Sequence, residues 1–422
     1  MKKVMWVAIA LMMATTWSAC SKNDDETTPD EPLSNENNEL RNISLTRSEY
    51  AMVDESNNFA FNLFREVTSQ SETPEKSQIV SPISITYALG MLNNGAAGET
   101  QAEINKVLGY EKTGADSINA FCRKMLTEAP NLDKLTKVMI ANNIYMNKGF
   151  ELMPDFINKA KTYYDAEPET REFNEETRQV INKWGNDHTE GMIPEVLKED
   201  EFDPSAVSYL LNAIYFKGAW AEKFDKGNTK DETFKGYSAE TQVPMMRQEH
   251  EFNYAETEDC QALCLPYGNN AYRMTILLPK EGKTISDVLK NLTAVTWQRY
   301  QRMGCAIVDV KLPRFESDTD LNLIPIMSAL GMPRAFINGL ADFLNFCDNV
   351  PTYIDLMKQV AKIKVSEEGT EAAAVTVIGI TEKSMGPSEP QHVQFFANRP
   401  FLYVISEQST GAIFFIGQYM GD

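Results

Sequence analysis

The side chains best suited to chemistry in this chain are its six cysteines and three histidines. Cys260 and Cys264 lie on a predicted strand, but a metal centre needs more ligands, and the nearest histidine, His250, is ten residues away. Once Cys20 is set aside, the remaining cysteines are odd in number and lack the spacing of a disulfide framework. We therefore expect no metal site, and we interpret these cysteines as structural thiols. They are Cys122, Cys260, Cys264, Cys305 and Cys347.

The chain also lacks the short motifs of common catalytic sites. It contains no Gly-x-Ser-x-Gly, no His-Glu-x-x-His and no glycine-rich phosphate loop. We therefore expect that it is not an enzyme and that it holds no cofactor. Any chemistry must then come from a partner that acts on an exposed segment of this chain.

Residues 367–380 combine the pattern of a strand with the composition of a hinge. With an alternation of period two, one face collects only small or apolar side chains. A loop of this length is ordinarily rich in Pro, Asn, Asp and Ser and has no preferred face. The segment is therefore predicted to have two conformations, an exposed loop and a buried strand, and we call it the reserve strand. Its inward face would carry Thr370, Ala372, Ala374, Thr376, Ile378 and Ile380.

Strands are predicted on both sides of this segment. Residues 361–365 alternate cleanly before it, and a turn-rich stretch, 384–390, follows it. Two apolar runs, 401–405 and 412–416, then predict a hairpin. The order is strand, long loop and hairpin, and long loops without structure of their own are usually functional or disordered.

Four motifs support a family resemblance that begins at about Asn58. They are the segments 81–85 with 95–100, 212–220 and 395–403, and the hinge Glu367, Glu368, Gly369, Thr370, Glu371, Ala372, Ala373 and Ala374. In this order they resemble the serpins, proteinase inhibitors that insert a reactive loop into a central sheet. The resemblance implies an α+β fold with a large central, mostly antiparallel sheet, smaller sheets and a helical layer. It also implies a single domain over 48–422 with an exposed reactive loop at about 367–391.

By the family's spacing, the resemblance places the cleaved bond between Lys383 and Ser384, with Lys383 seventeenth counting from Glu367. A lysine before the bond suits a trypsin-like serine protease, or a Lys-cleaving or papain-like cysteine protease. The length of 384–400 leaves the position open by a few residues. The implied function is that of a suicide-substrate inhibitor. The alternatives are a non-inhibitory serpin, acting as a binding module or plain protease substrate, and a structural surface protein.

The resemblance also implies a buried polar cluster that controls opening of the sheet, at Ser81, Ser84, Asn212 and Gln359. Gln359 replaces the family's usual histidine, and an amide does not titrate near neutral pH. We therefore expect no pH-dependent opening through this site. Trp220 resembles the aromatic residue at the top of the sheet, where insertion begins. Ordinary caps and a core tryptophan would explain these residues equally well without the family match.

The first residues predict a targeting segment. Lys2 and Lys3 precede an apolar stretch, 4–14, and small residues lead to Cys20. We interpret 1–19 as a signal peptide, Cys20 as a lipidated cysteine and 20–47 as a flexible acidic tether, similar to Bacteroides-like lipoproteins. Cleavage by an ordinary signal peptidase nearby, with Cys20 as a spare thiol, is the alternative. The expected location is the bacterial outer membrane and cell surface, or otherwise the extracellular space or periplasm.

Composition limits the remaining partners. The net charge is −20, so the chain should repel nucleic acid and heparin-like polyanions. With 43% hydrophobic residues it can bury a large core, and no apolar stretch after the leader reaches the ~18 residues of a membrane span. We expect a monomer whose partner is a target protease and which contacts a membrane through its N-terminal lipid.

Overall fold

The computed structural model describes residues 38–70, 75–347, 351–370 and 391–421, all of which belong to one compact unit. The helices are α1 (Arg47–Gln70), α2 (Pro82–Asn93), α3 (Gly98–Leu108), α4 (Ala115–Glu128), α5 (Pro154–Tyr164), α6 (Glu175–His188), α7 (Ile285–Lys290), α8 (Ala294–Tyr300) and α9 (Ile324–Leu330). Short 3-10 helices are η1 (Ala129–Asn131), η2 (Glu199–Glu201), η3 (Lys226–Asn228) and η4 (Pro333–Phe336).

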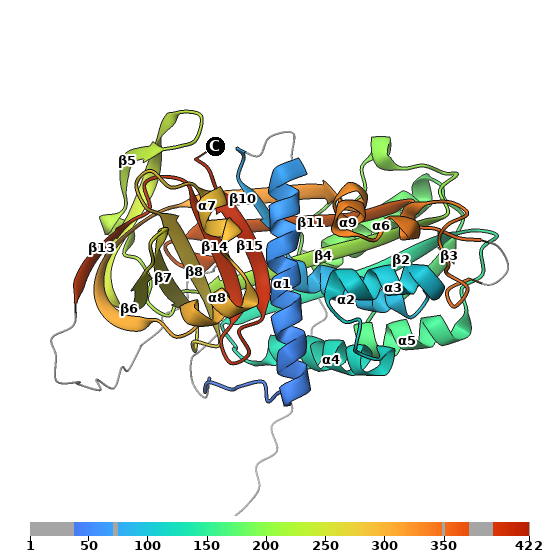
Figure 1. The fold of residues 1–422 in the computed structure, drawn as a ribbon. Helices are drawn as coiled ribbons and strands as arrows, with labels where there is room; N and C mark the ends of the chain where they lie inside the picture. Colours follow the sequence, from blue (N-terminus) through green and yellow to red (C-terminus); the bar gives the residue numbers. More distant parts are fainter. Residues whose placement is uncertain (1–37, 71–74, 348–350, 371–390, 422) are drawn as a thin grey trace, which may run out of the picture. The chain divides into compact units, whose positions relative to one another are not determined.

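The strands are β1 (Gln78–Val80), β2 (Thr136–Asn147), β3 (Glu169–Arg171), β4 (Ser208–Ala219), β5 (Lys230–Lys235), β6 (Glu240–Glu256), β7 (Cys260–Tyr267), β8 (Tyr272–Pro279), β9 (Gly304–Pro313), β10 (Phe315–Asn322), β11 (Leu356–Ser366), β12 (Gly369–Thr370), β13 (His392–Phe396), β14 (Phe401–Glu407) and β15 (Ile413–Tyr419). Figure 1 shows these elements along the chain.

Two sheets organise the described residues. The nine-stranded sheet has the order β1-β15-β14-β8-β7-β6-β9-β13, with β5 beside β6. The central sheet has the order β10-β11-β12-β4-β2-β3, and β11 also pairs directly with β4. In Figure 1 the nine-stranded sheet lies on the left, and the strands of the central sheet extend to the right. The predicted α+β fold is confirmed, with β11–β4 and β2–β3 as parallel pairs in an otherwise antiparallel central sheet.

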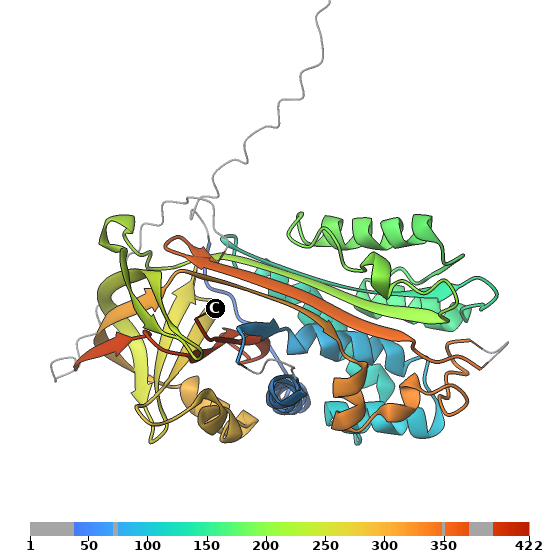
Figure 2. The ribbon, with the colours of Figure 1, turned by 90° about the horizontal axis from the view of Figure 1, so that it is seen from above.

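Helices cover both faces of the central sheet, as Figure 2 shows. Because successive side chains of a strand point to opposite faces, β4 feeds two apolar clusters. Leu211 packs in the cluster that contains Ile181 of α6. Leu210 belongs instead to the main core, which contains Ile85 of α2. β4 is therefore apolar on both faces, as is typical of a central strand.

The sequence explains why α2 lies inside the molecule. Ser81 precedes the helix with an extended backbone, and Pro82 takes the first helical position, where its missing N–H costs nothing. All twelve residues of α2 are buried. The helix can therefore present polar groups such as Ser84 to the inner face of the central sheet without contact with water.

The boundary predicted for the N-terminal tether is wrong in its last part. Residues 38–46 were expected to be flexible, but Ile43 is buried and its N–H donates a hydrogen bond of 2.9 Å to the Ser409 hydroxyl. Asn38 also donates to the Asp133 carboxylate at 2.7 Å. Apolar burial of a single isoleucine and a few long-range hydrogen bonds are enough to fix this segment on the folded body. Residues 1–37, with Cys20, lie outside the described residues.

The strands predicted around the hinge are present. The alternation at 361–365 belongs to β11, and the two apolar runs are β14 and β15, which pair with each other. Cys260 and Cys264 both lie on β7 and are buried. Burial raises the pKa of each of these two thiols.

Candidate functional site

The boundary between β4 and β11, termed the seam, differs in strand pairing between its two ends. From Leu356 opposite Tyr209 to Val360 opposite Ala213, the two strands pair directly and run parallel. At the other end of the seam, β12 lies between them and is antiparallel to both. A short piece of the hinge therefore already occupies the first strand position that opens between β4 and β11.

The conformation of β12 depends on a glycine. Gly369 has φ +141°, which a residue with a side chain rarely adopts. A Cβ at this position would lie 2.1 Å from the Gly218 carbonyl oxygen. Thr370 follows, pairs with Val365 and Gly218, and is fully buried. The expected exposed loop therefore does not begin at Glu367, because the hinge up to Thr370 is part of the sheet.

Thr370 is held by an aromatic pair at the top of the seam. Its hydroxyl lies 2.6 Å from that of Tyr267, which is also fully buried. The Tyr267 ring stacks on Trp220, with centroids 4.4 Å apart, and the Trp220 indole N–H donates to the Ser366 carbonyl at 2.9 Å. Burial raises the pKa of Tyr267 well above its ordinary value, so the hydroxyl stays protonated.

Glu367 anchors the turn before β12. Its carboxylate accepts hydrogen bonds from the Arg314 guanidinium at 2.5 and 3.2 Å and from the Thr229 hydroxyl at 2.7 Å. Only 2% of the Glu367 side chain is exposed. Burial tends to raise the pKa of Glu367, but its hydrogen bonds with Arg314 and Thr229 outweigh this effect and lower it.

Glu368 forms a second anchor on the other side of the turn. Its carboxylate lies 2.9 Å from the Lys223 ammonium and 3.0 Å from that of Lys226. The hydrogen bond from Lys223 is the main cause of a lowered pKa at Glu368. The Glu368 carbonyl also accepts the Trp220 backbone N–H at 3.0 Å. Two ionised glutamates therefore fix the base of the hinge.

The predicted polar cluster comes together in the directly paired part of the seam. Gln359 of β11 stands opposite Asn212 of β4, and its amide nitrogen lies 2.6 Å from the Asn212 side-chain oxygen. The same nitrogen lies 2.9 Å from the Ser84 hydroxyl, which donates to Asn212 at 2.8 Å. Ser81 takes part through its backbone, because its N–H donates to Gln359 at 2.9 Å while its own hydroxyl has no partner among the described residues.

Asn142 extends this cluster to a third strand. It stands opposite Asn212 in the β2–β4 register and accepts a hydrogen bond of 2.7 Å from the Asn212 amide. A polar row therefore crosses β11, β4 and β2. The sequence signal was an asparagine pair, Asn142 and Asn143, inside the otherwise apolar run 138–146, but nothing local indicated which strand it would meet.

The remaining predicted site residues lie outside the described residues. They are Glu371, Ala372, Ala373, Ala374, Lys383, Ser384 and Cys20. Over the described ranges, no group of three or more His, Cys, Asp and Glu side chains is arranged to hold a metal ion. No helix in the same ranges is both long and apolar enough to span a membrane.

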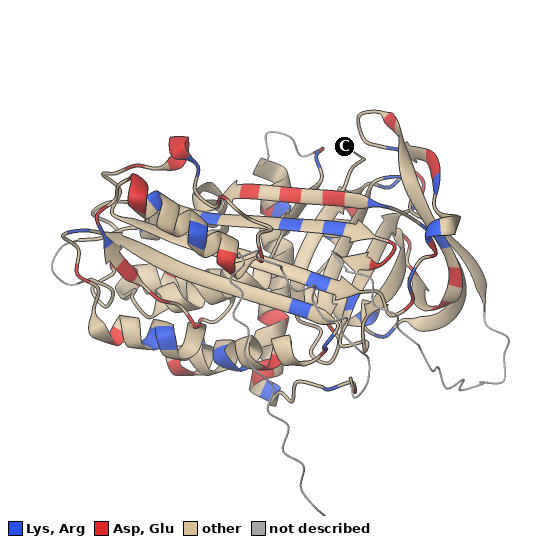
Figure 3. Cartoon of the chain, turned by 180° about the vertical axis from the view of Figure 1, so that it is seen from behind, with Lys and Arg blue, Asp and Glu red and all other residues tan. Residues whose placement is uncertain are grey.

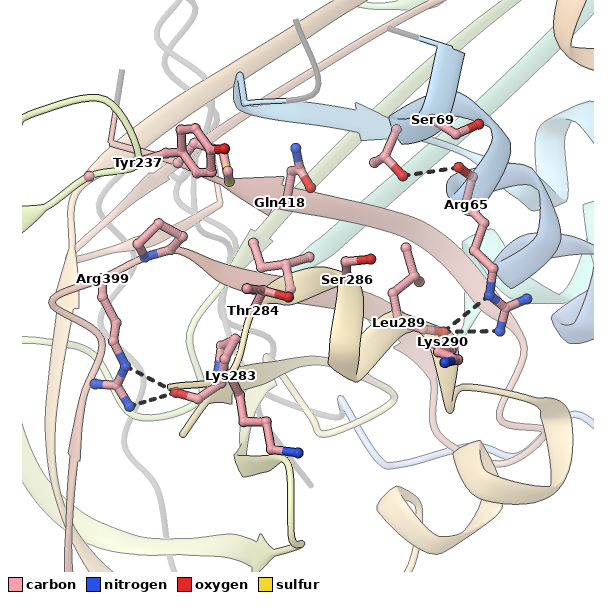
Figure 4. Close-up of a pocket in the computed structure, with 16 residues that line it drawn as sticks. Arg65, Ser69, Tyr237, Lys283, Thr284, Ser286, Leu289, Lys290, Arg399 and Gln418 are labelled. Carbon is pink, nitrogen blue, oxygen red and sulfur yellow. Dashed lines mark hydrogen bonds between the residues drawn. The ribbon is translucent and has the colours of Figure 1, made fainter. Parts of the chain in front are cut away.

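A cavity of about 620 Å³ lies away from the seam, between α1, α7 and the nine-stranded sheet (Figure 4). Arg65 on α1 and Arg399 before β14 line it, and both guanidinium groups donate to backbone carbonyls. The carbonyls belong to Leu289 and Pro279. The two arginines therefore stabilise the fold at this cavity, and none of the predicted site residues in the described ranges lines it.

Comparisons with known proteins identify the family of this chain. The family model for Serpin (serine protease inhibitor) matches residues 54–421, and the chain therefore belongs to the serpin family. Human Serpin B4 is 32% identical over 384 residues, which cover 86% of this chain and 97% of that protein. Leukocyte elastase inhibitor of Equus caballus is 33% identical over 379 residues, covering 86% and 97%. The native structure of tengpin, a thermophilic serpin, has a TM-score of 0.81 and 28% identity, covering 91% and 97%.

Proposed function

We propose that this protein is a suicide-substrate inhibitor of a trypsin-like serine protease or of a Lys-cleaving or papain-like cysteine protease. The observation that carries the proposal is β12, because Gly369 and Thr370 already pair with both strands that must part. β4 and β11 are parallel, so a loop entering from the top of the seam can be antiparallel to both. Serpin family membership and the inhibitor among its relatives support the same function.

The register of β12 predicts where each loop residue would go. Thr370 stands opposite Gly218 and Val365. Continued residue by residue, this register brings Thr376 opposite both Asn212 and Gln359, in the polar row. Inward positions from Thr370 to Ile380 carry no charged side chain, so no desolvated charge opposes insertion of that part of the loop.

The proposed reaction begins on the target enzyme. Its nucleophile attacks the carbonyl carbon of Lys383, the bond to Ser384 breaks, and the new amino terminus at Ser384 takes a proton. The acyl-enzyme stays attached to Lys383 while the loop inserts and carries the enzyme along. Ordering each inserted residue costs about 1–2 kcal/mol of backbone entropy, so new ladder hydrogen bonds and buried apolar area must exceed this cost.

The test uses a small panel of trypsin-like and cysteine proteases, with complexes detected as SDS-stable bands. We expect a released peptide that begins at Ser384 and has 39 residues, 422 minus 383. Lys383→Ala should abolish inhibition by Lys-directed enzymes, whereas Lys290→Ala, an exposed lysine on α7, should not. A peptide that begins several residues away would refute the register of the cleaved bond. Cleavage of the wild-type loop without a stable complex would favour the non-inhibitory alternative.

A further inference from the structure

A second polar cluster connects the two sides of the seam on the face that α6 covers. Lys358 lies on β11 beside Gln359 and stands opposite Leu211, which packs in the α6 cluster. Only 1% of its side chain is exposed. Its ammonium contacts the Glu201 carboxylate of η2 and lies 2.8 Å from the Asp320 carboxylate of β10.

Glu201 belongs to the connector between α6 and β4, residues 189–207. Lys198 of the same connector forms a second ion pair with Asp320 at 2.7 Å, and its N–H donates to Glu201 at 2.9 Å. The connector is also fixed to β4, because the Asp203 N–H donates to the Tyr209 hydroxyl at 2.8 Å. It is therefore attached to the β4 side of the seam and, through two ion pairs, to the β10–β11 side.

Strand insertion would strain this arrangement. A new strand moves β4 and β11 apart by about 4.8 Å, which is further than the Lys198–Asp320 pair, at 2.7 Å, and the Lys358–Glu201 pair can follow while intact. Either the ion pairs break or the connector leaves β4. The pair between Glu316 of β10 and Lys364 of β11 differs, because both strands move together and its 2.6 Å contact survives. Figure 3 shows the acidic residues along β10 beside the lysines of β11.

A buried lysine at this position needs a reason beyond stability. Taking an ammonium out of water costs several kcal/mol, and a buried ion pair often does no more than offset that cost. The two carboxylates paired with Lys358 are about one-third exposed, and one of them, Glu201, lies on the connector, which meets β11 only in the closed sheet. Such an arrangement favours one geometry of the sheet over another rather than adding net stability.

We propose that Lys358, Glu201, Asp320 and Lys198 form a latch that sets the rate at which the seam opens. Lys358 is a positioning residue for loop insertion, since its proposed role acts through its ion pairs on the movement of the seam and not on the cleaved bond. This inference rests on the proposed function, because it concerns the same seam and the same inserted strand.

The test measures insertion without a protease. A synthetic peptide with the sequence of residues 370–383 is incubated with intact protein, and its incorporation is followed on native gels. Glu201→Gln keeps the Lys358–Asp320 contact and removes one of the two ion pairs that cross the seam, the pair between Lys358 and Glu201. We expect insertion about fivefold faster, equivalent to about 1 kcal/mol. Glu316→Gln, the matched control within the β10–β11 pair, should insert the peptide at the wild-type rate.

A double-mutant cycle separates the latch from general destabilisation. In Lys358→Met, Glu201→Gln should accelerate insertion little further, because the partner is already gone. Lys358→Arg should restore a rate near wild type, and denaturant unfolding identifies any variant that fails to fold. A Glu201→Gln rate equal to that of wild type would overturn the latch while leaving inhibition intact. Wild-type protein that neither takes up the peptide nor forms a protease complex would overturn the proposed function, and the latch with it.

Discussion

The buried position of Thr370 makes it the sharpest test of loop insertion. Its side chain is fully buried and lies 2.6 Å from the neutral Tyr267 hydroxyl, which cannot compensate a charge. In Thr370→Arg, the unpaired cation should leave this buried position, and it would have to enter the sheet again at the first inward position when the loop inserts. We expect a penalty of about 3 kcal/mol or more, which slows insertion at least about a hundredfold.

The assay is the stoichiometry of inhibition, the number of inhibitor molecules cleaved for each protease molecule trapped. Thr370→Arg leaves Lys383 available for cleavage, so slow insertion should turn the inhibitor into a substrate. Thr370→Val removes only the hydrogen bond with Tyr267 and should cost about 1 kcal/mol, with a small rise in stoichiometry. Glu371→Arg, one residue on and predicted to face outward, is the matched charge control. Equal behaviour of the two arginine variants would refute the alternation on which the inserted strand depends.

Two further predictions concern the ion pair of Glu367 with Arg314 and the cellular location of the protein. The pKa of Glu367 is lower in the folded protein than in the unfolded chain, where a glutamate has a pKa of about 4.3. Its ion pair with Arg314 therefore stabilises the fold fully at pH values above the unfolded pKa. This contribution is lost as the pH falls through the lower pKa of the folded state. The free energy of unfolding of Glu367→Gln, measured with denaturant, should therefore fall less than that of wild type between about pH 7 and pH 3. Equal falls in the two proteins would contradict this role of Glu367. Cys20→Ala should release the protein from the membrane fraction into the soluble fraction. A wild-type protein that is already soluble, and whose mass shows no attached lipid, would exclude the lipid anchor at Cys20.

The strands around the hinge were predictable from local alternation, and part of the polar cluster was predictable from the family motifs. Alternation in 361–365 predicts β11, and the family motifs place Ser84, Asn212 and Gln359 on α2, β4 and β11. The hydrogen bonds among these three side chains agree with that placement. Ser81 differs, because a sequence pattern identifies a residue type but not whether its side chain or its backbone makes the contact.

Contacts between distant segments were not predictable. Tyr267 and Thr370 are 103 residues apart, and Arg314 is 53 residues from Glu367. From its neighbours in the sequence, each of these residues would be interpreted as an ordinary strand residue or as a solvent-exposed charge. Lys358 is the clearest case, since it lies on the same face of β11 as Lys362 and Lys364 and would be interpreted as solvent-facing. Only the connector that covers it makes the position buried, and the connector is far away in the sequence.

The chemistry of the reserve strand matches the two polar positions that it would meet in the seam. Thr370 already satisfies the Tyr267 hydroxyl. Six residues later, the continued register would bring Thr376 between Asn212 and Gln359, whose direct hydrogen bond of 2.6 Å must break when the strands part. A threonine hydroxyl can both donate and accept, whereas an alanine there would not replace the hydrogen bond lost between Asn212 and Gln359, at a cost of about 1–3 kcal/mol. In the same register Ala372, Ala374 and Ile378 would stand opposite apolar residues of both strands. Hydroxyls at the polar positions and small or apolar side chains between them are the pattern expected of a loop whose sequence is selected for the inserted state as well as the exposed one.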